Sequence, residues 1–326
     1  MNKEAGSTNE DHPLVSVVIP TYGRNEHLPE ALESVVNQTY SNIELLIVDD
    51  GSPIPVTETL PDMSFNKKIE SVNLIRHNEN RGANAARNTG IRAATGKYLA
   101  FLDDDDKWHK SKIRKQVKVF EKSSSRVGVV YTGKRTNGPN GTTYMQPSAD
   151  GDVIRDLLVG KEFGQFSSVM IKADAIEKVG LPDEALPAWQ DREWFFRLAK
   201  QYHFKPISEP LTHRRIGLPD RITKDFEKKR DIAYPLFVKK HYPFAREYGY
   251  FYARSFIATL RLNIARSAIQ ANRYKEARKH FLRAFLSNPL HWPVYPHLLA
   301  SVGGKWTYKT AAFLRKKTIE LLSKIV

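Results

Sequence analysis

The chain of 326 residues contains no cysteine and no long hydrophobic run. Without cysteine it can form no disulfide, no thiolate metal site and no cysteine nucleophile, which fits a reducing compartment. No stretch approaches the roughly 20 apolar residues that span a bilayer. The first apolar run, Leu14 to Ile19, is too short for a signal peptide and lacks its basic flank. These absences predict a cytoplasmic protein and leave open a peripheral position on the cytoplasmic face of a membrane.

Acidic residues are scarce in the C-terminal part of the chain. Residues 201–326 hold 25 Lys and Arg against 8 Asp and Glu, whereas residues 1–200 hold 26 against 28. Such uneven charge predicts an anionic partner for the C-terminal part, such as a membrane surface, an acidic polymer or nucleic acid. No recognised nucleic-acid-binding motif is present, so we expect no nucleic acid.

Glycine-rich phosphate-binding loops are also missing. The turn after the first apolar run, Thr21 to Glu26, contains neither G-x-G-x-x-G nor a glycine-rich basic loop. This argues against a dinucleotide-dependent oxidoreductase and against a nucleotidyltransferase.

Short apolar runs alternate with helical patterns in the first hundred residues. The runs predict buried strands at residues 14–20, 43–48, 72–75 and 98–102. This alternation favours an α/β fold with a mostly parallel sheet, and ligands of such sheets lie at the carboxyl ends of the strands. By that rule Tyr22, Asp50 and the acids from Asp103 to Asp105 should share one crevice.

Four consecutive carboxylates, Asp103 to Asp106, follow the fourth predicted strand. Carboxylates so close together repel one another and need a positive partner. Their hard oxygen ligands suit Mg²⁺ or Mn²⁺, which usually share their coordination with substrate phosphates. The alternative is a solvated acidic turn in which Asp106 caps the next helix.

The middle of the chain is less regular. We expect helices at 111–121 and 190–199, a short helix ending at 179, strands at 127–131 and 169–171, and a functional loop at 132–148. Asp191 falls in the first turn of the 190–199 helix, at its positive dipole end.

The C-terminal part is predicted to be helical, with a basic helix at 223–240. Small and aromatic residues between 264 and 289 match a single tetratricopeptide-type helix pair, a pattern that ordinary helical hairpins share. Residues 310–326 form an amphipathic helix that lies in a membrane interface or packs on the protein. We therefore expect a disordered segment at 1–13, a catalytic domain at 14–220 and a basic helical region at 221–326.

Four segments in order resemble the family 2 inverting glycosyltransferases with the GT-A fold. The segments are Val15–Tyr22, Val48–Ser52, Asn80–Asn88 and Phe101–Asp106. Each is weak alone, but the ordered set is specific. The resemblance extends loosely to Asp191 and fades after about residue 220. It implies a GT-A fold, here with a helical C-terminal extension, and transfer of a sugar from a nucleotide-diphosphate donor to an acceptor hydroxyl.

The resemblance also implies roles for individual residues. It implies that a set of residues binds the donor. In this set Tyr22 stacks on the base, Asp50 accepts hydrogen bonds from the base, and arginines face the diphosphate. This set is Pro20, Thr21, Tyr22, Arg24, Asp50, Arg81, Gly82, Arg87, Asp103, Asp104, Arg214 and Arg215. Asp103-x-Asp105 matches the DxD motif, in which Asp105 binds Mn²⁺ or Mg²⁺ directly and Asp103 also contributes.

Asp191 matches the general base of the family, which deprotonates the acceptor hydroxyl so that configuration inverts. The family usually places a Glu-Asp pair at this position, whereas this chain has Gln190 before the aspartate. Relatives also place a histidine two residues after an arginine near residue 213. Here His213 precedes Arg214 and Arg215, so its role as a metal ligand is left open.

The acceptor is expected to be a glycan, a lipid-linked molecule or a protein, in the synthesis of surface glycans or glycoconjugates. The alternative is a catalytically degenerate domain that binds an anionic polymer or membrane through its basic tail. The sequence does not indicate the donor sugar, the nucleotide base or the oligomeric state.

Overall fold

A computed structural model describes residues 12–60, 69–138, 141–215 and 226–301, together with 304, 306, 307 and 310. The disordered start and the terminal amphipathic helix expected from the sequence lie outside the described residues, apart from a few positions, as do Ile216 and Gly217. Within the described part, no helix combines the length and the apolar character needed to cross a bilayer.

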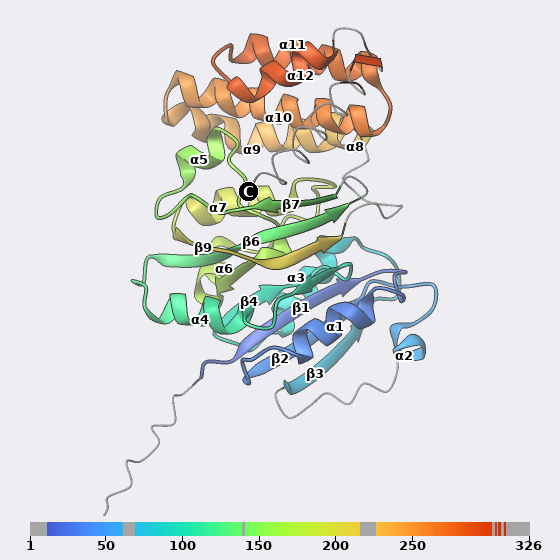
Figure 1. Ribbon diagram of the computed structural model, residues 1–326. Helices are drawn as coiled ribbons and strands as arrows, with labels where there is room; N and C mark the ends of the chain where they lie inside the picture. Colours follow the sequence, from blue (N-terminus) through green and yellow to red (C-terminus); the bar gives the residue numbers. More distant parts are fainter. Residues whose placement is uncertain are drawn as a thin grey trace, which may run out of the picture.

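A single sheet forms the centre of the molecule, with nine strands in the described ranges (Figure 1). The strands are β1 (Val15–Thr21), β2 (Ile43–Asp49), β3 (Ile69–Arg76), β4 (Tyr98–Phe101), β5 (Asp106–Trp108), β6 (Val127–Gly138), β7 (Gly141–Met145), β8 (Val169–Lys172) and β9 (His203–Arg215). Their order is β3-β2-β1-β4-β8-β6-β9-β5, and β7 pairs with β6.

The first half of this sheet is parallel, as the alternating pattern predicts. β1 lies between β2 and β4, and Val17 is in register with Leu45 and Ala100. All seven residues of β1 and of β2 are buried, which explains why most of them are apolar. The second half is mixed, because β8 is antiparallel to β4 and β6, whereas β6 and β9 are parallel.

Helices cover both faces of the sheet. The helices of this part are α1 (Leu28–Val36), α2 (Val56–Thr59), α3 (Ala83–Ala93), α4 (Lys112–Glu121), α5 (Ile154–Leu158), α6 (Ala173–Val179) and α7 (Gln190–Ala199), with a 3-10 turn at Phe166–Ser168. α1, α2 and α4 share one hydrophobic core with the sheet, and α3, α5, α6 and α7 pack into a core on its other face.

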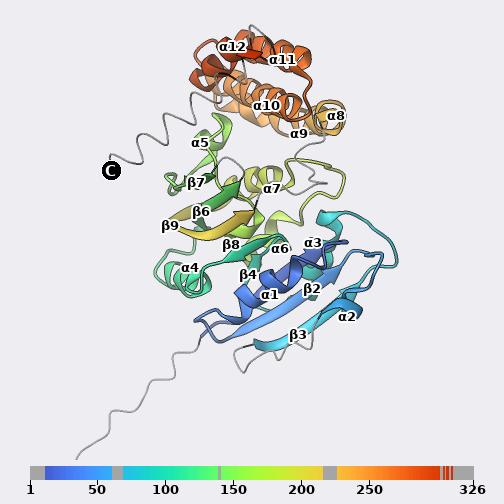
Figure 2. The ribbon, with the colours of Figure 1, turned by 45° about the vertical axis from the view of Figure 1, so that its right-hand side comes forward.

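The C-terminal helices stack beyond the mixed half of the sheet, at the opposite end from β3 (Figures 1 and 2). They are α8 (Phe226–Lys228), a π-helical segment (Lys229–Ala233), α9 (Tyr234–Glu247), α10 (Tyr250–Gln270), α11 (Tyr274–Ser287), a 3-10 turn (Trp292–Val294) and α12 (Tyr295–Ser301). α10 and α11 form the expected helix pair, and its small residues Ala265, Ala268 and Ala277 are buried between them. That this pair is of tetratricopeptide type stays a prediction.

Aromatic rings join this helical region to the sheet. Phe196 of α7 lies 5.8 Å from Phe237 of α9 and 5.8 Å from Phe256 of α10, measured between ring centroids. All three rings are buried in the core that also covers the sheet. The expected boundary near residue 220 falls in a segment that is not described, but α9 and the first half of α10 pack into that same core.

Two sequence predictions differ from the structure. Residues 132–148 were expected to form a loop, which is wrong, because β6 continues to Gly138 and forms a hairpin with β7. The second difference is the alternative in which Asp106 caps a helix: Asp106 is buried in β5, and α4 begins only at Lys112, after Ser111. The basic helix expected at 223–240 begins, in the described part, at Phe226 and continues to Glu247.

Candidate functional site

The carboxyl ends of β1, β2 and β4 open onto a pocket of about 370 Å³. This is the edge at which ligands of parallel sheets lie. Most of the residues that the sequence assigned to the donor line it, together with Asp105, which was assigned to the metal. They are Pro20, Thr21, Tyr22, Arg24, Asp50, Gly82, Arg87, Asp103, Asp104, Asp105 and Arg214.

Asp50 is held at the floor of this pocket by the residues around it. Its carboxylate accepts hydrogen bonds from the backbone N–H groups of Arg81 (3.0 Å) and Gly82 (2.7 Å). His77, which follows β3, lies 2.7 Å from the same carboxylate through Nδ1, and its Nε2 lies 2.8 Å from the hydroxyl of Thr89. These contacts fix the orientation of Asp50 before any ligand binds.

Gly82 makes that approach possible. Its φ of 94° is a left-handed value that side chains rarely adopt, and it directs the N–H of the residue toward Asp50 at the start of α3.

Asp104 and Arg24 form the side of the pocket nearest β1. The Asp104 carboxylate accepts hydrogen bonds from the Thr21 hydroxyl (2.8 Å) and from Arg24 Nη1 (3.0 Å). The same Arg24 nitrogen lies 3.1 Å from Asp105. Burial raises the pKa of Asp104 to about 6, although Arg24 and the Thr21 hydroxyl act in the opposite direction.

Three of the four consecutive carboxylates gather as a candidate metal site. Ligand atoms of Asp103, Asp105 and Asp106 lie within 4.8 Å of one another. Burial and the negative charges of Asp103 and Asp105 raise the pKa of Asp106 to about 8.

The donor set of this cluster fits a divalent cation. Three carboxylates from one strand end offer the oxygen ligands that Mg²⁺ and Mn²⁺ take. Asp106 Oδ1 is buried and has no hydrogen-bond partner among the described residues. A cation would satisfy that oxygen and offset the repulsion among the three carboxylates.

Arg87 connects the acidic cluster to α7. Its Nη2 lies 2.6 Å from Asp103, its Nη1 lies 3.5 Å from the Gln190 side chain, and its guanidinium lies 3.9 Å from the centre of the Phe166 ring. Arg87 is buried, and its Nε has no hydrogen-bond partner in the described part of the chain. Its guanidinium therefore retains a donor for an anionic ligand.

β9 explains why Arg214 reaches the pocket. In the pairing of β5 with β9, Arg214 is opposite Asp106 and His213 is opposite Lys107. Neighbouring strand residues face opposite sides of a sheet, and His213 is not among the described residues that gather as the acidic cluster. Arg215 pairs instead with Glu30 (2.5 Å) and lies outside the pocket lining.

The side chain of Arg81 is also outside the pocket lining. It lies 3.7 Å from Glu184 and is half exposed, so only its backbone N–H contacts Asp50.

Asp191 lies in a second pocket of about 320 Å³, beside the first. The two pockets are adjacent along the segment from 160 to 165, because Gly164 lines the second and Gln165 the first. Burial raises the pKa of Asp191, and the charge of Asp103 adds to this, while the Arg192 N–H and the charge of Arg87 act against it. Asp191 is thus within electrostatic reach of the donor pocket.

Strained backbone precedes Asp191. Trp189, at the N-cap of α7, has a φ of 59° and a ψ of 30°, a left-handed conformation that costs a non-glycine residue on the order of 1–3 kcal/mol. Its ring packs against Phe237 of α9 at 5.9 Å. Packing therefore holds the turn that places Asp191 in the second pocket and the Gln190 side chain beside Arg87.

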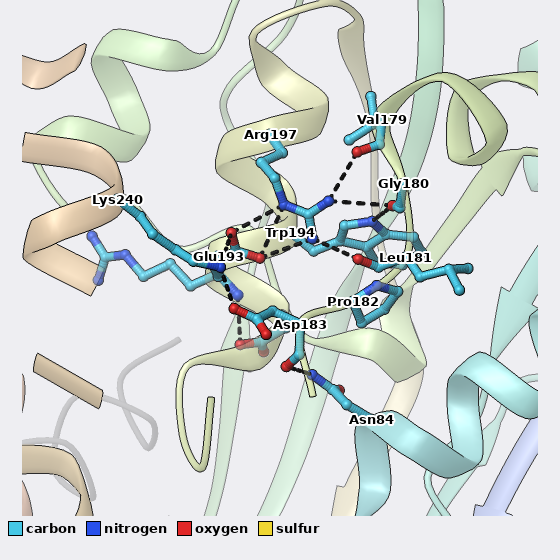
Figure 3. A network of polar contacts seen from close by, with 12 residues as sticks. Asn84, Val179, Gly180, Leu181, Pro182, Asp183, Glu193, Trp194, Arg197 and Lys240 are labelled. Atoms are coloured by element: carbon cyan, nitrogen blue, oxygen red, sulfur yellow. Dashed lines mark hydrogen bonds and ion pairs between the residues drawn. The ribbon is translucent and has the colours of Figure 1, made fainter. Parts of the chain in front are cut away.

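A partly buried polar network ties α7 to α3 (Figure 3). Arg197 bonds to Glu193 in α7 and donates to the carbonyl groups of Val179 (3.0 Å), Gly180 (3.3 Å) and Leu181 (2.8 Å). The loop after Gly180 is held in turn by α3, because the Asn84 side chain donates to the Asp183 carbonyl at 2.7 Å. Lys240 of α9 pairs with the Asp183 carboxylate. This network fixes the helix that carries Asp191 relative to the helix that carries Arg87.

Sequence reasoning missed two residues of the site. His77 follows a strand end, so the rule that placed Asp50 could have indicated it. Gln165, which lines the donor pocket and donates to Asp106, lies in an irregular segment with no motif. No local signal identified it.

The family described as glycosyl transferase family 2 matches residues 16–179, half of the chain. The putative teichuronic acid biosynthesis glycosyltransferase TuaG of Bacillus subtilis is 35% identical over 217 residues, which cover 63% of this chain and 79% of that protein. An uncharacterized glycosyltransferase of Rickettsia bellii is 32% identical over 207 residues, 60% of this chain. Those residues are 29% of the Rickettsia protein, so the chain spans less than a third of that relative.

Solved structures share the fold. TarS of S. aureus (residues 1–349) in complex with UDP-GlcNAc aligns with a TM-score of 0.56 at 14% identity, over 88% of this chain and 91% of that chain. The mannosyltransferase PcManGT of Pyrobaculum calidifontis, in complex with GDP-Man and Mn²⁺, aligns with a TM-score of 0.54 at 19% identity, over 95% and 87%. Both alignments extend into the C-terminal helices, and they bear out the GT-A fold and its helical extension.

Proposed function

The chain belongs to glycosyl transferase family 2, and from that premise we propose that it moves a sugar from a nucleotide-diphosphate donor to an acceptor hydroxyl with inversion, aided by Mn²⁺ or Mg²⁺. The observation that carries the proposal is the shared pocket at the strand ends, where the acids Asp50, Asp103 and Asp105 meet Arg87. Two proteins of the same fold bind UDP-GlcNAc and GDP-Man, the second with Mn²⁺.

The donor pocket offers complementary groups for each part of a sugar nucleotide. Tyr22 is 46% exposed at the mouth of the pocket and presents its ring for stacking on the base. Asp50 presents a fixed carboxylate to the polar edge of the base. Arg87 and Arg214 supply guanidinium groups for the diphosphate.

Asp103, Asp105 and Asp106 would hold the metal ion, for which their geometry and the unpartnered Asp106 oxygen are suited. When bound, such an ion neutralises charge that develops on the departing diphosphate.

Asp191 is the proposed general base. The acceptor oxygen attacks the anomeric carbon and forms the new glycosidic bond as the bond to the diphosphate oxygen breaks. The proton of the hydroxyl passes to the Asp191 carboxylate, and the nucleoside diphosphate leaves with the electron pair of the broken bond. Attack opposite the leaving group inverts configuration. The pocket beside Asp191 is where the acceptor, a glycan, lipid-linked molecule or protein, would enter.

The test is metal-dependent release of nucleoside diphosphate from a panel of sugar nucleotides. We expect release with Mn²⁺ or Mg²⁺, a fall to background in excess chelator, and at least a hundredfold loss in Asp105→Asn. Asp174→Asn, which removes an exposed carboxylate from α6, is the matched control and should keep full activity. Undiminished release in chelator would contradict the role of the metal. Absence of nucleotide binding would favour the degenerate binding domain.

We also propose that the helical region meets an anionic membrane surface. Residues 226–301 carry 14 Lys and Arg against 4 Asp and Glu. Large apolar side chains protrude at the outer end of the same region, including Leu286 (60% exposed), Leu290 (78%), Trp292 (73%) and Leu299 (72%). Basic charge combined with exposed leucine and tryptophan is typical of surfaces that lie in a membrane interface.

A further inference from the structure

The pocket beside Asp191 is built partly by the C-terminal helices. One wall is the segment from Leu157 to Gly164, a second is the first turn of α7, and the third is α10, which contributes Asn263 and Arg266. These two residues lie well beyond the part of the chain that the family matches, residues 16–179. The α10 wall is therefore a place where this chain can differ from its family in what it binds.

Arg192 leaves much of its hydrogen-bonding capacity unused in this pocket. Its Nη2 donates to the Leu157 carbonyl at 3.1 Å, while its Nε is buried and bonds to nothing in the described ranges. The guanidinium forms no salt bridge within those ranges, although it follows Asp191 in the chain. Burying a guanidinium without acceptors is costly, so an unpartnered donor of this kind points to a missing acceptor.

A second guanidinium approaches the same place from α10. The Nε and Nη2 atoms of Arg266 lie 3.3 and 3.2 Å from Nε2 of the His297 ring. Burial lowers the pKa of His291, and the positive charges of Arg266 and Arg192 lower it further. Both arginines therefore lie close enough to His291 for their charges to lower the pKa of this one buried ring.

Two carboxylates in or next to this pocket are already paired with lysines. Glu162 pairs with Lys134, and Asp156 pairs with Lys161 at 2.7 Å. The remaining carboxylate of the lining is Asp191 itself, the proposed base. A ligand in this pocket therefore meets two guanidinium groups beside the group that would take its proton.

We propose that this pocket binds an acceptor carrying an oxyanion, a phosphate or a carboxylate, which Arg192 and Arg266 hold while the hydroxyl to be glycosylated faces Asp191. The inference rests on the proposed function for the role of Asp191, and it adds the substrate class. Guanidinium forks pair with phosphate and carboxylate through two parallel hydrogen bonds, and such charge-assisted bonds also fix orientation. An anchored oxyanion would set the position of the neighbouring hydroxyl.

The test measures direct binding to the full-length protein by isothermal titration. The probes are short oligomers of glycerol phosphate, oligouronates and neutral oligosaccharides of the same length. We expect at least one anionic series to bind at least tenfold more tightly than the neutral series. Whichever anionic series binds identifies the oxyanion as phosphate or carboxylate.

Variants then locate the contact. Arg266→Gln should weaken binding of the anionic probe at least tenfold, and Arg266→Lys, which keeps the charge, should restore much of it. Arg192→Gln is the second variant and should act in the same direction. Lys275→Gln removes one positive charge from an exposed position of α11 and is the matched control. Equal affinities for neutral and anionic probes, or equal losses in Arg266→Gln and Lys275→Gln, would overturn the inference.

Donor chemistry separates this inference from the proposed function. Slow hydrolysis of the sugar nucleotide, in which water replaces the acceptor, reports on the donor pocket alone. Donor hydrolysis without any preference for anionic probes would refute the anionic acceptor and leave the proposed function intact. Anionic binding without release of nucleotide from any donor would support the pocket and refute the proposed function.

Discussion

At the scale of single residues, the environment of Asp191 suits a general base. Its burial raises the pKa, and the Arg192 N–H lies 2.7 Å from its Oδ1. A carboxylate that is hard to keep ionised accepts a proton more readily than an exposed one. Gln190 is neutral where family members usually carry glutamate, so burial rather than a second carboxylate is the main cause of the raised pKa.

Replacing Asp191 by asparagine should remove proton transfer and leave donor binding intact. We expect turnover to fall by about 10²–10⁴-fold, the usual contribution of a positioned base, with the donor dissociation constant unchanged. The carboxylate must be ionised to act, so activity of the parent should fall as pH decreases through a midpoint above the usual pKa of aspartate.

Steady-state kinetics and donor titration check both statements. Asp231→Asn, at an exposed position of the C-terminal region, is the control. Turnover of Asp191→Asn within a few-fold of the parent would show that another group accepts the proton.

The site residues that could be predicted from the sequence without the family resemblance follow one rule. Polar side chains at the carboxyl ends of parallel strands lie close together. Asp50 and Asp103 obey it because β2 and β4 flank β1 in register. Asp191 follows no strand, and only the family resemblance indicated it. The role of Gln165 could not be predicted from the sequence, because its position depends on a long-range contact with Asp106 that no local pattern encodes.

At the scale of elements, the position of α7 depends on the Glu193–Arg197 pair. Burial alone would raise the pKa of Glu193, but the His241 ring 3.4 Å away, hydrogen bonds from Arg197 and the nearby positive charges outweigh it and hold the pKa at about 2. Glu193 is only 1% exposed, whereas Arg197 is 23% exposed. The carboxylate is therefore buried as an anion and depends on its cationic partners.

Glu193→Gln should destabilise the protein by about 2 kcal/mol, because it leaves Arg197 and Lys240 without the charge that compensates their partial burial. The folded pKa lies below that of an unfolded glutamate, so the contribution of Glu193 is complete above about pH 4.5. It is lost as pH falls toward the folded value of about 2.

Urea unfolding followed at pH 7 and at pH 3 measures this effect. Glu177→Gln, an exposed glutamate of α6, is the control and should change the free energy of unfolding little. An equal effect of Glu193→Gln at both pH values would mean that lost packing, not lost charge, causes it.

Strands that are buried on both faces could be predicted, and others could not. β1, β2 and β4 are mostly apolar because both of their faces are covered. β9 did not, because Pro206 and Pro210 interrupt it and charged residues occupy its exposed face. β7 is exposed along most of its length, so its polar residues are typical of a loop. Pairing with β6, rather than propensity, makes it a strand.

At the scale of the whole molecule, charge and exposed apolar area coincide in the helical region. Leu290 and Trp292 are each more than 70% exposed, and they follow α11, on which Leu286 is 60% exposed. Burying a side chain such as leucine in an apolar phase is worth about 2 kcal/mol, and each basic residue near an anionic membrane adds about 1 kcal/mol. Together these contributions suffice for reversible binding to a membrane.

The full-length protein should therefore sediment with vesicles that contain anionic lipid, and less so as salt increases. We expect Leu290→Glu combined with Trp292→Glu to reduce the bound fraction at least tenfold. Val72→Glu places a single glutamate on the exposed side of β3, at the other end of the molecule, and should have no effect. Concentration-dependent dimerisation that the double variant abolishes, without any vesicle binding, would show that a second copy covers this surface.

The interlocking of Phe196, Phe237 and Phe256 has a consequence for protein engineering. In a chimaera that carries the C-terminal helices of a relative, the replaced rings would no longer match Phe196, and the mismatch would shift the helix bearing Asp191. Such a chimaera should therefore also carry the aromatic residues of α7 from the same relative. α7 and the helices after it would therefore have to be exchanged together, as one block.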